Sequence, residues 1–129
     1  MKKILIVDDD SDVRALLEKT LMKCGCAILT AADGQQALAI ARDEHPDLII
    51  MDIMMPGTID GIEATRILKA DLKTRRSNVI VLTGMGVAEI RGKVKNAGAA
   101  SLFQKPFSPL ELLDAIEGIL GRTCPGGSP

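Results

Sequence analysis

Short, almost purely apolar runs alternate with amphipathic stretches along this chain, and that alternation constrains its fold more than any other feature. The strongest runs are Lys3–Val7, Leu48–Met51 and Val79–Leu82. Continuous hydrophobicity over so few residues is typical of parallel strands that are covered on both faces. Two weaker strand candidates are Ala27–Thr30 and Ser101–Phe103.

The stretches between these runs carry apolar residues at helical spacings of three and four. The clearest faces comprise Val13, Leu16, Leu17 and Leu21, then Ile62, Ile67 and Ala70, and finally Leu110, Leu113, Ile116 and Leu120. Capping-box patterns predict helix starts after Asp33, Asp60 and Ser108. Gly25 and Gly98 follow helical patterns, where left-handed caps would end the helices.

Five strand–helix units follow from this alternation. Right-handed crossovers then predict an α/β fold with one parallel sheet and helices on both faces. A length of 129 residues suits a single domain. We expect the domain to occupy residues 1–121, with a Gly/Pro-rich, flexible tail or linker at residues 122–129.

Composition argues against several classes of protein. A formal net charge of -1 and the absence of Trp and Tyr disfavour direct binding of nucleic acid. No apolar run approaches the roughly 18–20 residues that cross a bilayer, so no membrane association is expected. Three cysteines without a framework spacing do not suggest a disulfide scaffold, and we expect a cytoplasmic protein.

Chemically reactive residues follow four of the five predicted strands. Acids follow the first strand, one acid ends the third, a hydroxyl and a glycine follow the fourth, and an ammonium follows the fifth. In chain order these residues are Asp8, Asp9, Asp10, Asp52, Thr83, Gly84, Lys105 and Pro106. Because ligands of open α/β sheets bind beyond the carboxyl ends of the strands, we expect these groups to converge at one edge.

Clustered carboxylates repel one another and therefore call for a cation. Oxygen ligands without His or Cys favour Mg²⁺, or Mn²⁺, over zinc. An aspartate can attack phosphorus to give an acyl phosphate, provided that metal, ammonium and hydrogen-bond donors neutralise the phosphoryl oxygens. Lys105 supplies a point charge, Thr83 a hydroxyl, and Gly84 an unobstructed backbone N–H. Asp10 is better explained as the N-cap of the first helix than as a metal ligand.

At these positions the chain resembles the receiver domains of two-component response regulators. The resemblance spans residues 2 to about 120 and is carried by the segments at residues 4–10, 47–57, 60–61, 81–84 and 105–107. It implies a flavodoxin-like (βα)5 three-layer sandwich with a five-stranded parallel sheet in the order 2-1-3-4-5. It also implies a histidine kinase or phosphotransfer protein as phosphoryl donor, and allows a homodimer that forms on phosphorylation.

The resemblance also implies a role for each matching residue. Asp52 is the expected phospho-acceptor, and the expected metal ligands are Asp8, Asp9, Asp52 and the backbone carbonyl of Met54. Thr83, Gly84 and Lys105 are expected to contact the phosphoryl group, and Pro106 is the candidate for a cis peptide bond. The expected output surface consists of the last two helices and the strand between them.

One position departs from the family pattern. The family usually has an aromatic residue three positions before the lysine, where this chain has Leu102. Phe103 is one residue later and would face the opposite side of a strand, so we expect it to fill the core. Leu102 is therefore placed on the output surface, and the usual aromatic movement is not expected here.

Three other functions remain open at this stage. A Mg²⁺-dependent aspartyl phosphatase would typically need a second acid two residues after the nucleophile, where this chain has Met54. A flavin-binding protein needs a phosphate-cradling first loop, but this chain has acids there. An interaction module without phosphorylation would not need the complete acid, hydroxyl and lysine set. We therefore expect a regulator that is not an enzyme, with an effector that the sequence leaves unknown.

Overall fold

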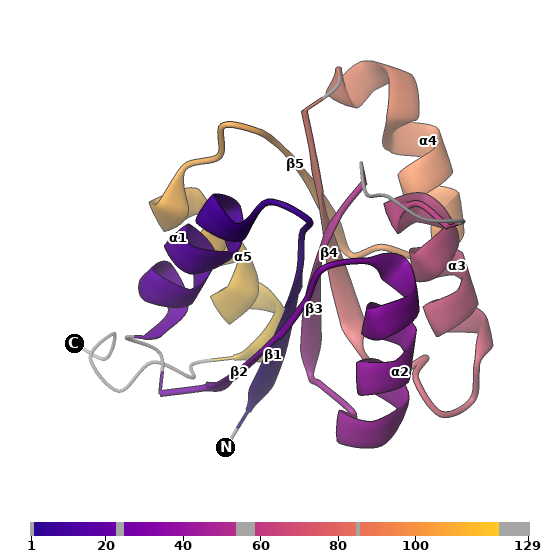
Figure 1. Ribbon diagram of the computed structural model, residues 1–129. Coiled ribbons are helices and arrows are strands. Elements are labelled where there is room, and N and C mark those ends of the chain that lie inside the picture. Colours follow the sequence, from indigo (N-terminus) through magenta and orange to yellow (C-terminus); the bar gives the residue numbers. More distant parts are fainter. Residues whose placement is uncertain (1, 23–24, 54–58, 85, 122–129) are drawn as a thin grey trace.

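A computed structural model describes residues 2–22, 25–53, 59–84 and 86–121 of the chain. Strands and helices alternate strictly within these ranges (Figure 1). In chain order they are β1 (Lys3–Val7), α1 (Ser11–Leu21), β2 (Ala27–Ala31), α2 (Gly34–Glu44), β3 (Leu48–Asp52), α3 (Gly61–Ala70), β4 (Asn78–Thr83), α4 (Val87–Ala97), β5 (Ser101–Gln104) and α5 (Pro109–Leu120). The five predicted strand positions are confirmed: β1 has the predicted bounds, and the other four strands are longer by one or two residues.

The strands form one parallel sheet in the order β2-β1-β3-β4-β5. Helices α1 and α5 cover one face of this sheet, and α2, α3 and α4 cover the other (Figure 1). The predicted flavodoxin-like three-layer architecture and its strand order are therefore confirmed. The tail expected at residues 122–129 lies outside the described residues.

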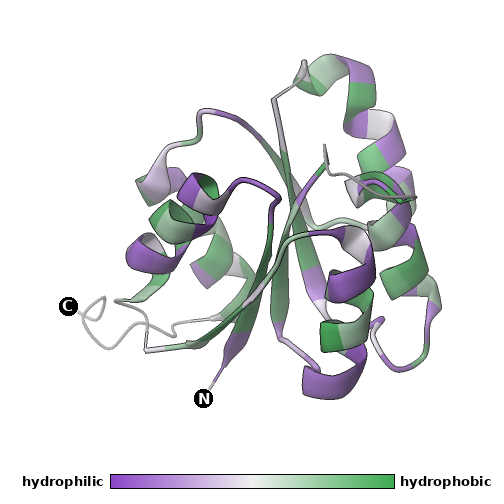
Figure 2. Cartoon of the chain, viewed as in Figure 1, coloured by the Kyte–Doolittle hydropathy of each residue, from purple (hydrophilic) through white to green (hydrophobic). Residues whose placement is uncertain are grey.

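The core is divided between the two faces by simple alternation along the strands. Leu5 and Val7 of β1 pack toward α2, α3 and α4, whereas Ile4 and Ile6 pack toward α1 and α5. All four of these side chains are almost completely buried. Figure 2 shows the strands as largely hydrophobic, whereas hydrophobic and hydrophilic residues alternate along the helices. This two-sided burial explains why the strands read as continuous apolar runs.

Side-chain caps fix the start of four helices. Asp10, Asp33, Asp60 and Ser108 each accept a hydrogen bond from a backbone N–H in the first turn of the helix that follows. The cap interpretation of Asp10 is thus confirmed, as are the three capping-box predictions. Helix α4 differs, because Gly86 precedes it and provides no side-chain hydrogen bond.

The predicted helix ends are correct at one glycine and wrong at the other. Gly98 ends α4 with a φ of 101°, as a left-handed cap does. Gly25 also has a positive φ of 68°, but α1 ends at Leu21 and its C-cap, Met22, has a right-handed conformation. Gly25 instead closes a turn by donating its N–H to the carbonyl of Met22.

Two apolar side chains on the predicted helix faces are not buried. Leu16 of α1 is 49% exposed and Leu110 of α5 is 74% exposed. Their neighbours Leu17 and Leu112 reach the core instead. The apolar face of each helix is wider than the part that packs on the sheet, so residues at its margin remain in solvent. Helical spacing alone therefore did not distinguish these two exposed leucines from the buried ones.

A close approach of backbone to backbone explains Gly61. A Cβ at this position would lie only 2.1 Å from the carbonyl oxygen of Asp52. Gly61 also donates its N–H to the carbonyl of Ile53 over 3.0 Å. Only glycine permits this contact, which brings the start of α3 directly against the end of β3.

In the described part of the chain, no helix is both long and apolar enough to span a bilayer.

Candidate functional site

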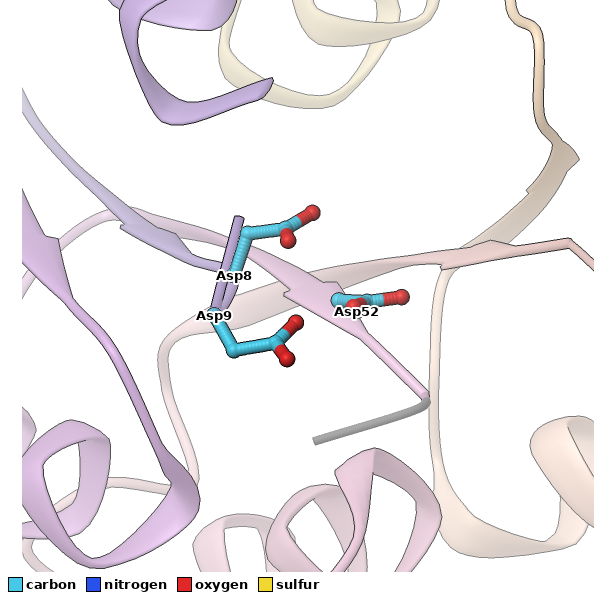
Figure 3. Close-up of side chains that lie close together, drawn as sticks. All are labelled: Asp8, Asp9 and Asp52. Carbon is cyan, nitrogen blue, oxygen red and sulfur yellow. The ribbon is translucent and has the colours of Figure 1, made fainter. Parts of the chain in front are cut away.

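Three carboxylates meet where the central strands end. Asp8 and Asp9 follow β1 directly, and Asp52 is the last residue of β3. These strands are neighbours, with Val7 of β1 beside Met51 of β3. One oxygen atom from each of the three acids lies within 4.8 Å of the others. Figure 3 shows the three carboxylates directed to the same side of the strand ends.

Lys105 directly follows the edge strand β5, and its side chain reaches this cluster. Its Nζ lies 3.0 Å from Oδ2 of Asp8 and 3.2 Å from Oδ1 of Asp52. Burial lowers the pKa of Lys105, but the hydrogen bond to Asp8 and the charge of Asp52 outweigh that effect and raise its pKa overall. The lysine therefore remains a cation that bridges two nearly buried carboxylates.

Asp8 is held in place on every side. It is only 1% exposed, and its Oδ1 accepts the backbone N–H of Asp10 over 2.9 Å. Its own N–H donates to the carbonyl of Ala31, and its carbonyl accepts a hydrogen bond from the guanidinium of Arg14. Arg14 was not among the site residues predicted from the sequence. The sequence did offer a signal for it, because Arg14 is a cation in the first turn of the helix that follows the three acids.

Asp9 has the opposite character. Its side chain is exposed and has no hydrogen-bond or ion-pair partner among the residues that the structure describes. Both oxygens of Asp8 already accept hydrogen bonds, from Asp10 and from Lys105. Of the two acids that follow β1, Asp9 is therefore the one available to a new ligand. Asp10 is turned away into its cap and does not belong to the cluster.

The hydroxyl and glycine predicted for the site follow at the end of β4. Thr83 is completely buried, and its carbonyl accepts the N–H of Lys105 over 2.6 Å. A Cβ at Gly84 would meet nothing within 4 Å, so space remains around this backbone. The peptide bond between Lys105 and Pro106 is cis, as expected. Met54, whose carbonyl was predicted as a metal ligand, lies outside the described residues.

Leu102 and Phe103 face opposite sides of β5, as the sequence predicted. Phe103 packs with the α1 and α5 side of the core, whereas Leu102 packs with the α2, α3 and α4 side. Both side chains are only partly buried. Leu102 also lines a cavity of about 280 Å³ between α4 and β5.

The donor set suits a small, hard cation. Asp8, Asp9 and Asp52 offer oxygen atoms only, and His and Cys do not contribute to this cluster. Such ligands fit Mg²⁺ or Mn²⁺, which usually keep several waters and bind through one or two carboxylates. Lys105 neutralises part of the cluster's charge but leaves it acidic overall. The residues present therefore fit the metal that the sequence suggested.

The family model of the response regulator receiver domain matches residues 4–117 of the chain. The chain belongs to the response regulator receiver family. It is 42% identical over 127 residues to the phosphate regulon transcriptional regulatory protein PhoB of Pseudomonas aeruginosa, covering 98% of this chain and 55% of PhoB. It is also 36% identical to Protein PilG of the same organism, over 89% of this chain and 84% of PilG. The receiver domain spans about half the length of several curated relatives that it matches.

Solved receiver structures have the same fold. The chemotaxis protein CheY4 of Vibrio cholerae matches with a TM-score of 0.85 and 33% identity, covering 93% of this chain and 99% of CheY4. The receiver domain of the sensor histidine kinase PA1611 of Pseudomonas aeruginosa matches with a TM-score of 0.84 and 32% identity, over 93% of this chain and 98% of that domain. That neighbour is described with a magnesium ion coordinated in its active-site cleft. The present receiver domain has three carboxylates, those of Asp8, Asp9 and Asp52, that could hold a metal ion.

Proposed function

We propose that this receiver domain accepts a phosphoryl group on Asp52 in a Mg²⁺-dependent reaction and passes the signal to a partner through its α4-β5-α5 surface. The observation that carries this proposal is the position of Lys105, whose Nζ bridges Asp8 and Asp52 beside the exposed Asp9. Transfer of an anionic phosphoryl group needs a carboxylate that attacks, positive charge that stabilises the phosphoryl oxygens, and further acids that bind the metal. Asp52, Lys105 and the two neighbouring acids provide these groups.

In the proposed transfer, a carboxylate oxygen of Asp52 attacks phosphorus. The P–N bond of a phosphohistidine donor breaks, and the histidine takes up a proton as it leaves. Lys105 stabilises the charge on the phosphoryl oxygens, and Thr83 and the N–H of Gly84 are the proposed hydrogen-bond donors. Asp52 is only 4% exposed, so its carboxylate is shielded from bulk water before transfer.

Asp9 is the proposed principal ligand of the metal, together with Asp52. Asp8 orients the cluster, since its oxygens already accept bonds from Asp10 and Lys105. The carbonyl of Met54 remains a proposed ligand on the strength of the family resemblance. Bound Mg²⁺ would supply additional positive charge to the phosphoryl oxygens.

An apolar face beside the site supports a protein as phosphoryl donor. Val13, Leu16, Pro106 and Phe107 line a cavity of about 360 Å³ together with Lys105. A second cavity of about 360 Å³ continues along α1 and α5, lined by Leu16, Lys19, Thr20, Pro109, Leu110 and Leu113. Exposed leucines next to a reactive rim suit a surface that is covered during transfer. We propose that a histidine kinase or phosphotransfer protein covers it.

The output is proposed to involve α4, β5 and α5. Helix α4 has no side-chain cap and carries Gly92 in its interior, so it is weakly stabilised locally. Leu102 lines the groove between α4 and β5. Phosphorylation would draw Thr83 toward the new charge and allow α4 and Leu102 to repack. A homodimer of the phosphorylated chain is one proposed consequence, measurable by light scattering before and after phosphorylation.

Acetyl phosphate with MgCl₂, followed by intact mass measurement, tests the phospho-acceptor. The wild-type chain should gain one phosphoryl group, and chelation of the metal should prevent the gain. Asp52→Asn should not react, whereas the control Asp43→Asn, an exposed carboxylate on α2, should react like the wild type. Phosphorylation of Asp52→Asn to the wild-type extent would contradict the proposal.

A protein donor tests the apolar face separately. Leu16→Lys should slow transfer from an autophosphorylated histidine kinase that phosphorylates the wild type, and leave the reaction with acetyl phosphate unchanged. Equal loss with both donors would show that the substitution damages the site itself.

The rival readings predict different outcomes of these measurements. Repeated turnover of p-nitrophenyl phosphate would favour an aspartyl phosphatase. A chain that never becomes phosphorylated would favour an interaction module. We propose a cytoplasmic regulator that is not an enzyme toward other substrates, and its effector, whether a further domain or another protein, is not assigned.

A further inference from the structure

The α3–β4 loop, residues 71–77, lies at the end of the sheet opposite the acidic site (Figure 1). Hydrogen bonds to the neighbouring segments fix the conformation of this loop. Thr74 donates its hydroxyl to the carbonyl of Leu68 over 2.7 Å, and Ser77 donates to the carbonyl of Pro46 over 2.6 Å. Lys69, near the end of α3, donates hydrogen bonds from its Nζ to the carbonyls of Arg75 and Ser77. The loop is therefore already ordered before it meets any ligand.

The outward side of this loop combines one large apolar side chain with several cations. Leu72 is 76% exposed, the highest value among the exposed large hydrophobic residues of the described chain. Lys73, Arg75 and Arg76 are also exposed, and none of them forms an ion pair with a described residue. The outward side of the loop therefore offers both an apolar contact and positive charge to a ligand.

A cavity of about 390 Å³ adjoins the loop. It is lined by His45, Pro46, Asp47, Leu72, Lys73, Arg76 and Ser77. Asp47 is the one acid in this lining, and its Oδ2 already accepts the backbone N–H of Lys3 over 2.8 Å. Lys73 and Arg76 therefore leave the cavity positively charged overall.

Neighbouring charges offset this surplus only in part, because the acids form ion pairs with other cations and only Asp71 also attracts Lys73. Arg42 of α2 contacts Asp71 over 3.1 Å, and Lys3 contacts Glu44 over 3.2 Å. The acids nearest to the loop are thus occupied. The ring of His45 is held at 3.2 Å from the carbonyl of Lys73.

We propose that this cavity and Leu72 form a second binding surface, which takes an acidic segment of a partner protein. A glutamate or aspartate of that segment would enter the cavity between Lys73 and Arg76, and an adjacent apolar side chain would cover Leu72. The guanidinium of Arg76 offers the paired N–H groups that a carboxylate accepts. The concave shape favours a protruding side chain over a flat anionic membrane, into which only Leu72 could insert.

This surface is independent of the phosphorylation site. It lies at the amino ends of β3 and β4, whereas the acids lie at the carboxyl ends. Binding should therefore occur in the unphosphorylated chain and should survive Asp52→Asn.

A titration followed by NMR tests the proposal. The isotope-labelled chain is titrated with a capped peptide of sequence Glu-Asp-Leu-Phe-Glu-Asp, and then with its amide counterpart Gln-Asn-Leu-Phe-Gln-Asn. Amide shifts should be confined to residues 42–48 and 69–78, and the amide peptide should bind at least tenfold more weakly. Raising the salt concentration should weaken binding of the acidic peptide, since the cations are exposed.

Substitutions then assign the contacts. Arg76→Gln and Lys73→Gln should each weaken binding about fivefold, which is the factor given by about 1 kcal/mol of charge attraction. Leu72→Ser should weaken it by a similar factor. Lys93→Gln, the same charge change on the exposed side of α4, should leave affinity unchanged. Each variant should still react with acetyl phosphate, so a failure here is distinct from failure of the proposed phosphorylation.

Three results would overturn the proposal. The first is the absence of shifts in the loop at millimolar peptide. The second is equal binding of the acidic and amide peptides. The third is co-sedimentation with vesicles of equimolar phosphatidylcholine and phosphatidylserine that the same three substitutions abolish, which would assign the loop to an anionic membrane instead.

Discussion

The two ends of the parallel sheet use polar residues in opposite ways. At the carboxyl end, Asp8, Asp9 and Asp52 crowd together, and Lys105 is the cation that contacts two of them. At the amino end, buried hydroxyls are satisfied, as Ser77 is by the carbonyl of Pro46, and the cations without an ion pair, Lys73, Arg75 and Arg76, are exposed. The carboxyl end keeps like charges close together, whereas the amino end leaves its unpaired charges in solvent. The difference indicates that unfavourable electrostatics are concentrated at the carboxyl end, where the candidate site lies.

The largest expected effect concerns the backbone contact that builds the functional end. Gly61→Ala should destabilise the domain by about 3 kcal/mol, because a Cβ would meet the carbonyl of Asp52 and force α3 away from β3. Urea unfolding measures this loss. Gly118→Ala in α5, where a Cβ meets nothing within 4 Å, is the matched control and should be neutral or slightly stabilising. Equal effects of both substitutions would show that the close approach is not important.

The next effect concerns the opposite end. Ser77→Ala should cost about 1–3 kcal/mol, because the buried carbonyl of Pro46 loses its donor. Phosphorylation by acetyl phosphate at a temperature below unfolding should be unchanged. If the reaction fell in proportion to stability, the two ends would not be separable in the way proposed.

A third prediction has the opposite sign. Asp9→Asn should stabilise the metal-free domain by up to about 1 kcal/mol, because it removes one of three crowded carboxylates. The same substitution should abolish the stabilisation that MgCl₂ gives to the wild type. Thermal unfolding with and without MgCl₂ measures both effects. Destabilisation of the metal-free chain would indicate that Asp9 has a structural role.

The smallest effect is a pH dependence at the amino end. The N–H of Lys73 and the guanidinium of Arg42 lower the pKa of Asp71. A lowered pKa in the folded state gives stability above the unfolded-state pKa, which is lost as the pH falls through the folded-state value. The difference in stability between wild type and Asp71→Asn should therefore shrink on acidification. A constant difference from neutral to strongly acidic pH would contradict this assignment.

Sequence patterns predicted most of the fold because they report local physics. The apolar runs located all five strands, and short polar side chains located the caps of α1, α2, α3 and α5. The predicted end of α1 was wrong, because a glycine such as Gly25 can serve either as a helix cap or in a separate turn. Leu16 and Leu110 were assigned to helix faces that the sheet does not fully cover.

The residues of the candidate site were predicted from the sequence, but which of them already have hydrogen-bond partners was not. The order of residues after the strands indicated which acids would gather with Lys105. It did not show that Asp8 is already saturated by Asp10 and Lys105 while Asp9 is exposed. Arg14 was missed, because its role depends on how α1 turns back over the end of β1.

The alternation of strands and helices and the chemistry that follows each strand could be predicted from residue patterns, since both depend on neighbours in the chain. Residue patterns did not predict the strand order, which was expected only from the family resemblance. The assembled sheet sets which strands lie side by side, and therefore which distant charges come within a few ångströms of one another. It also decided which charges are already paired, at the site and around Lys73 and Arg76 alike. Pairing depends on distances in space, and residues 97 positions apart, such as Asp8 and Lys105, become neighbours only when the sheet assembles.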